Sequence, residues 1–197
     1  MTRTLTIQTP HGSLHNLFER PDEAHGLILL IRTHHAPIDT TITAALVGRG
    51  YAVLRCELLT SQEAQFADAT QNVPRLSQRL IEILDLIRRD GDMLDLPLTL
   101  LASGDSSPAA VRAAAQRDSQ VKVVACHGGL IDRAGLQALH LLAAPLLMLF
   151  DADDEIGPTA FQRAASHLDC RHVTKVLELG EDPLPAVVDW IRLHSAA

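Results

Sequence analysis

The sequence has few aromatic residues, which make up 3% of its 197 positions. A core with so few rings must be filled mainly by Leu, Val, Ile and Ala. With 47% hydrophobic and 21% charged residues, the composition is still typical of a folded globular protein rather than a disordered one. The length suits one domain with a sizeable core, so we expect a single domain over residues 1–197.

Cysteines are scarce and widely spaced. Cys56, Cys126 and Cys170 show no CxxC spacing, which argues against a disulfide framework or a thiolate metal site. We interpret them as small core residues of a protein in the reducing cytoplasm.

Basic clusters and long apolar runs are also missing. The 17 Lys and Arg residues are scattered and the formal net charge is -7, so we expect no nucleic-acid partner. Residues 1–7 alternate polar and apolar, and no later stretch reaches the roughly 18 apolar residues of a membrane span. We therefore expect a cytoplasmic protein with no membrane partner.

Short apolar runs alternate with helical patterns along most of the chain. Alternating residues in 1–20 predict an antiparallel hairpin. After it, strands are predicted at 27–31, 51–56, 98–102, 121–126, 145–150 and 173–179, with helices between them and at the C-terminus. Because the strands are almost continuously apolar, the pattern predicts a mostly parallel sheet between two helical layers. Residues 60–72 read as one long polar loop.

Chemically reactive residues follow these strands at their carboxyl ends, where open α/β sheets bind ligands. They are His34 and His35, Glu57, Ser106, His127, and the aspartates 151, 153 and 154. Serine, imidazole and carboxylate together are what acyl transfer requires.

The segment Gly104-Asp-Ser-Ser-Pro108 lies between an apolar strand and an alanine-rich helix. This is the layout of a nucleophile elbow, in which Ser106 would stand at the corner and the amide of Ser107 would stabilise an oxyanion. The simpler reading of Ser106 is a helix cap.

This elbow, together with residues 50–60, 127–129 and 144–154, resembles the dienelactone-hydrolase-like branch of the α/β-hydrolase superfamily. The resemblance covers residues 26–194. It implies an α/β three-layer sandwich without a lid domain, with Ser106 as nucleophile and Asp154 as acid. It also implies a small ester or lactone as substrate and no cofactor.

Two departures from that family pattern affect the chemistry. The segment 32–37 replaces a glycine-rich oxyanion loop with Arg32-Thr-His34-His35-Ala-Pro. The loop 179–184 carries carboxylates where the family places its catalytic histidine. Arg32, His34 and His35 are thus candidate oxyanion or binding residues, and the general base is unassigned.

His127 is a candidate base, because its strand should neighbour the strand before Ser106. A Ser106–His127 dyad is one reading, and a histidine bonded to loop backbone is the other. The histidines and carboxylates match no recognised metal motif, so no metal site is expected. Two functions remain open: a serine hydrolase of small esters or lactones with a degenerate triad, and an inactive relative that serves as a binding or assembly module. The oligomeric state is not indicated.

Overall fold

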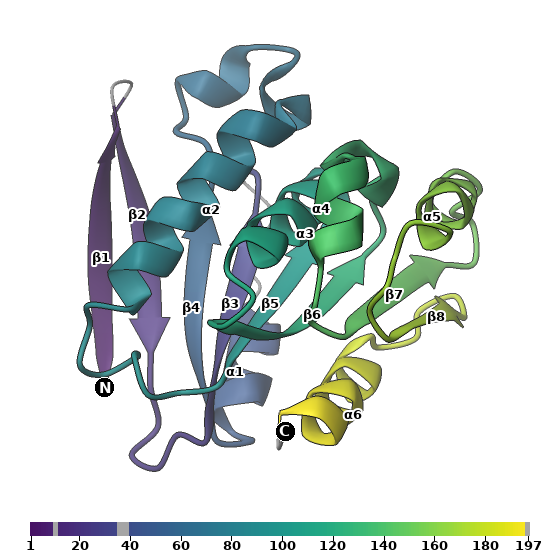
Figure 1. Cartoon of the computed structure of the whole chain (residues 1–197). Helices are drawn as coiled ribbons and strands as arrows, with labels where there is room; N and C mark the ends of the chain where they lie inside the picture. Colours follow the sequence, from purple (N-terminus) through teal and green to yellow (C-terminus); the bar gives the residue numbers. More distant parts are fainter. Residues whose placement is uncertain (10–11, 35–39, 196–197) are drawn as a thin grey trace.

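The computed structural model describes residues 1–9, 12–34 and 40–195, and it contains one eight-stranded sheet flanked by helices (Figure 1). The strands lie in the order β1-β2-β4-β3-β5-β6-β7-β8. Strand β2 pairs antiparallel with β1 and β4, and every later pairing is parallel. This confirms the predicted α/β sandwich with an N-terminal hairpin at its antiparallel edge.

The elements follow the predicted order with small shifts at their ends. The strands are β1 (Thr2–Thr9), β2 (Gly12–Glu19), β3 (Gly26–Arg32), β4 (Tyr51–Glu57), β5 (Leu98–Ser103), β6 (Val121–His127), β7 (Leu146–Asp151) and β8 (His172–Leu177). The α-helices are α1 (Thr40–Val47), α2 (Val73–Ile87), α3 (Ser107–Gln116), α4 (Leu136–Leu141), α5 (Gly157–Ala165) and α6 (Leu184–His194). None of the helices described is long and apolar enough to cross a membrane.

The two faces of the sheet carry separate aliphatic cores. Because successive strand side chains point to opposite faces, Leu29 packs with α2 to α5 whereas Leu30 packs with α1 and α6. The α1/α6 face is the smaller of the two cores. A strand-end residue is therefore assigned to a face by its position in this alternation.

Residues 60–72, predicted as one long polar loop, form a connection with some local helical structure. They contain two short 3₁₀ turns, Glu63–Gln65 and Ala69–Gln71. Glu63 is 1% exposed and its Oε2 accepts a 2.6 Å hydrogen bond from Arg79 of α2, which also donates to the Leu58 carbonyl. The guanidinium beside Glu63 lowers the pKa of that carboxyl to about 2. This buried ion pair fixes the segment beside the turn that follows β5.

Candidate functional site

The turn between β5 and α3 has its corner at Gly104 and not at Ser106. Gly104 has a φ of 53°, in the left-handed region, whereas Ser106 has φ −80° and ψ −18° and is already helical. Strand β5 ends at Ser103, one residue beyond its predicted end, and the chain turns directly after it, two residues before the predicted nucleophile. A Cβ built on Gly104 meets no atom within 4 Å. The exposed position of the elbow thus carries no side chain.

Ser106 is fully buried beneath this corner. Its Oγ accepts a 3.0 Å hydrogen bond from the Ser103 amide. The same hydroxyl lies 2.8 Å from the Ser103 carbonyl oxygen and 3.3 Å from that of Ile31, as donor to one of them. These partners are all backbone groups, so the hydroxyl fastens the turn to β5 and β3.

Ser107 is also fully buried. Its amide, the predicted oxyanion donor, donates to the Gly104 carbonyl within the turn. Its Oγ donates to the Gly128 carbonyl at 2.8 Å. A Cβ on the adjacent Gly129 would lie 2.2 Å from the Gly104 carbonyl oxygen, which shows how tightly the segment after β6 packs against the turn. The Ser107 amide is therefore engaged in holding the turn.

Asp154, the predicted acid, caps the start of α5. Its Oδ1 accepts hydrogen bonds from the amides of Gly157 at 2.8 Å and Ile156 at 3.2 Å. These amides belong to the N-cap residue and the first residue of the helix, and they have no intrahelical partner. The contacts of Asp154 are thus those of an aspartate that stabilises a helix entry.

His127 pairs with Asp151 instead of forming the predicted dyad with Ser106. Its Nε2 lies 2.8 Å from Asp151 Oδ1, and the two side chains are 30% and 60% exposed. Within the part of the chain that the structure describes, the Ser106 hydroxyl contacts backbone only. The Ser106 side chain points back toward β5 and β3, so no contact among the described residues supports a Ser106–His127 dyad.

Polar side chains from five neighbouring strands share the α1/α6 face at the carboxyl edge. In sheet order they are Glu57, Arg32, Ser103, His127 and Asp151, and we call them the polar row. Arg32 donates a hydrogen bond to the Ser103 hydroxyl, and Ser103 is the in-register neighbour of His127. A small hollow of about 30 Å³, space for roughly one water molecule, lies between part of the row and α6.

Of the two predicted binding histidines, His34 and His35, the structure describes only His34. His34 Nδ1 lies 3.6 Å from Glu57 Oε2, so a protonated His34 forms an ion pair at one end of the row. His35 lies outside the described residues. Among those described, no group of three His, Cys, Asp or Glu side chains could hold a metal ion.

The cysteines offer no replacement nucleophile at this edge. Cys56 and Cys126 are buried. Burial raises the pKa of the Cys56 thiol far above its usual range, and it raises that of Cys126 to about 12. Both are therefore neutral thiols at physiological pH.

Comparison with solved structures identifies this architecture. A dienelactone hydrolase from Anabaena variabilis superimposes with a TM-score of 0.84 at 22% identity, and 98% of each chain is covered. Est1E from Butyrivibrio proteoclasticus superimposes with a TM-score of 0.71 at 12% identity over 96% of each chain. The chain has the α/β-hydrolase fold.

Comparison of the sequence with curated proteins finds two relatives of low identity. No family model matches the chain. Two Mycobacterium tuberculosis proteins, provisionally named phosphoribosyl transferases, are 26% identical over 148 residues. The match covers 73% of this chain but only 33% of those proteins, so the chain spans about a third of the curated relatives it matches.

Proposed function

We propose that this chain uses the α/β-hydrolase scaffold as a binding module for a small carbonyl-containing ligand, such as an ester or lactone, and forms no acyl-enzyme at the turn after β5. One observation carries the proposal: the corner of the turn is Gly104, which has no side chain, while Ser106 is buried. A serine nucleophile needs an exposed hydroxyl and an imidazole within hydrogen-bond reach.

The polar row supports a binding role at the same edge of the sheet. It offers a guanidinium, a hydroxyl and an imidazole at strand ends, where open α/β sheets take their ligands. Such groups can hydrogen-bond to a carbonyl or ester oxygen.

Thiol accessibility tests this assignment of the corner. In separate variants, Gly104→Cys and Ser106→Cys would be exposed to iodoacetamide and mapped by peptide mass. We expect the thiol at 104 to react rapidly and the thiol at 106 to react only after unfolding, because the first faces open space and the second is buried. Rapid modification of both would contradict the proposal.

Activity-based labelling tests the chemistry itself. We expect a fluorophosphonate to leave Ser106 unmodified, and wild type and Ser106→Ala to hydrolyse p-nitrophenyl acetate at the same rate. A stoichiometric adduct on Ser106 that is lost in the alanine variant would overturn the proposal and support a serine hydrolase instead.

A second candidate is hydrolysis by water without a covalent intermediate. The observation that favours it is the 2.8 Å contact of His127 with Asp151, because a carboxylate that orients an imidazole prepares it as a general base. If this were the activity, His127→Gln would abolish ester hydrolysis. His15→Gln, which alters an exposed histidine on β2, would leave it unchanged. Equal rates for all three proteins would favour the binding module.

A further inference from the structure

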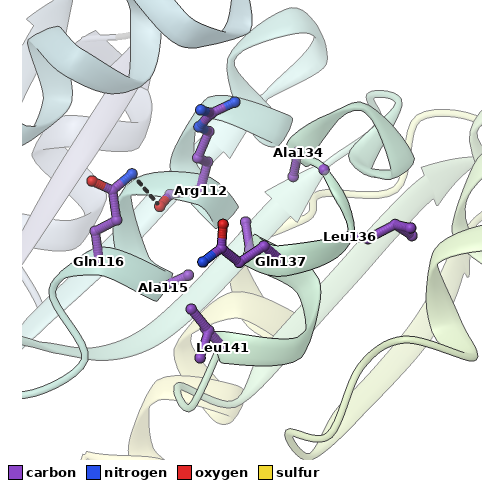
Figure 2. Close-up of a pocket in the computed structure, with 9 residues that line it drawn as sticks. Arg112, Ala115, Gln116, Ala134, Leu136, Gln137 and Leu141 are labelled. Atoms are coloured by element: carbon purple, nitrogen blue, oxygen red, sulfur yellow. Dashed lines mark hydrogen bonds between the residues drawn. The ribbon is translucent and has the colours of Figure 1, made fainter.

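A surface groove between α3 and α4 is separate from the carboxyl edge of the sheet (Figure 2). Its volume of about 480 Å³ is within the range of small-molecule sites. Figure 2 shows Gln137 and Leu141 of α4 beside Ala115 and Gln116 of α3. The groove lies along the second half of α3, away from the turn at the start of that helix, and the proposed function assigns it no role.

The surface of the groove is partly apolar. Ala115 and Ala138 are half-buried against the main core and leave space because their side chains are short. Leu136 and Leu141 of α4 also border the groove and are 61% and 56% exposed. A ligand with an apolar portion would remove leucine surface from water, which favours binding in proportion to the area covered.

The charged side chain of the groove is Arg112, with no carboxylate beside it. The nine lining residues include no Asp or Glu, although the chain contains 24. Among the described residues Arg112 has no ion pair with a carboxylate, as is also true of the exposed Arg75 of α2, whereas Arg79 pairs with Glu63. An anion in the groove would thus meet a guanidinium without displacing an existing ion pair.

Two glutamine side chains add amide groups to the part of the groove that contains Arg112. Gln116 donates its side-chain N–H to the Arg112 carbonyl at 3.4 Å, an interaction drawn in Figure 2. The side chain of Gln137 also borders the groove and provides a further amide donor. A guanidinium and an amide group next to apolar surface match an ionised head group on a hydrocarbon portion.

We propose that the α3–α4 groove binds a small amphipathic carboxylate, with its head group on Arg112 and its apolar portion against Ala115, Ala138 and Leu141. The carboxylate accepts hydrogen bonds from the guanidinium, and the hydrocarbon covers the exposed face of α4. The proposal does not depend on what happens at the turn after β5.

Sodium octanoate and octan-1-ol are suitable probes, because they share an apolar chain and differ in head-group charge. Each would be titrated into ¹⁵N-labelled full-length protein, with amide shifts followed by NMR. We expect saturable octanoate shifts confined to residues 112–116 and 134–141, and weaker binding of octanol. Arg112→Gln should weaken octanoate binding by about tenfold, the usual scale for a charge-assisted hydrogen bond, and leave octanol unchanged.

Two further variants keep this test specific. Arg75→Gln removes the same charge from an exposed position of α2 and should bind octanoate like wild type. Leu141→Ser should weaken both probes, because it removes apolar surface that both contact. Equal octanoate affinity in Arg112→Gln and Arg75→Gln, or shifts spread over the whole surface, would overturn the proposal. Amide spectra of the unliganded variants report whether each remains folded.

Discussion

The turn after β5 and the polar row lie along the same edge of the sheet but differ in what holds them. The turn is fixed by backbone contacts: the buried Ser106 hydroxyl binds main-chain groups of β5 and β3, and Gly129 packs against the Gly104 carbonyl. The polar row consists of side chains, and those of His127 and Asp151 are partly exposed. The corner of the turn is thus a glycine without a side chain, and the polar side chains of this edge stand in the neighbouring row.

Mutations at the turn should lower the stability of the protein more than mutations in the polar row. The largest effect is expected in residues 58–72, the segment that lies beside the turn. Arg79→Met removes the partner of the buried Glu63 carboxylate. Breaking a buried ion pair leaves an uncompensated charge, so we expect a loss of about 3–5 kcal/mol in the free energy of unfolding. Urea denaturation of wild type and variant measures it. Lys175→Met, which breaks the exposed pair with Glu181, is the matched control and should leave the urea midpoint close to that of wild type, because solvent screens an exposed pair.

The same pair predicts a dependence on pH. The folded pKa of Glu63, about 2, is below its usual value of 4.5. A group with a lowered folded pKa contributes stability that is complete above its unfolded pKa and is lost as the pH falls toward the folded one. Wild type should therefore lose stability between about pH 4.5 and pH 2, and the double variant Glu63→Gln/Arg79→Met should lose less over that interval. If the stability of the two proteins fell equally with pH over this interval, the Glu63–Arg79 pair would not be the source of the pH dependence.

Gly129→Ala tests the close approach that shapes the turn. The new Cβ would lie 2.2 Å from the Gly104 carbonyl oxygen, and Gly129 has a φ of 96°, which side chains rarely adopt. Overpacking and backbone strain together should cost about 2–4 kcal/mol, measured by urea denaturation. Gly91→Ala is the control because a Cβ there meets no atom within 4 Å. If Gly129→Ala unfolded at the same urea concentration as wild type, the close packing of Gly129 against the Gly104 carbonyl would not be needed for stability.

The sequence predicted the fold well because the strands are strongly apolar and separated by clear helical patterns. It placed the corner at Ser106 because the elbow layout, an apolar strand followed by Gly-x-Ser and an alanine-rich helix, puts its serine there. In the structure, Ser103 continues the alternation of β5 onto the α1/α6 face, and Gly104 then makes the turn. The left-handed φ of Gly104 could have been suspected, since glycine tolerates it without strain.

The polar row was only partly visible in the sequence. Arg32, Glu57, His127 and Asp151 were recognisable as residues at strand ends, but their partners depend on strand order and register. Ser103 was missed because the β5–β6 register that places it beside His127 is a tertiary property. Asp154 was chosen over Asp151 by resemblance, and its hydrogen bonds to the start of α5 depend on how the chain turns after β7.

Asp154→Ala separates the capping contacts of this residue from a role in chemistry. Loss of two amide contacts at the start of α5 should lower the free energy of unfolding by about 1 kcal/mol. Asp153→Ala changes an exposed neighbour and should have no measurable effect. The urea denaturation midpoints of both variants, compared with that of wild type, measure this contribution. Equal midpoints would show that the capping contacts contribute nothing.

The smallest effect is expected in the polar row, where His127→Gln completes the comparison. His127 and Asp151 are 30% and 60% exposed, and partly exposed ion pairs contribute about 0–1 kcal/mol. A double-mutant cycle of His127→Gln and Asp151→Asn, read by urea denaturation, should give a coupling energy below about 1 kcal/mol. A coupling of several kcal/mol would mean that the row, like the turn, is part of the structural framework. A small value would leave these side chains available for a ligand, because their loss would not compromise the fold.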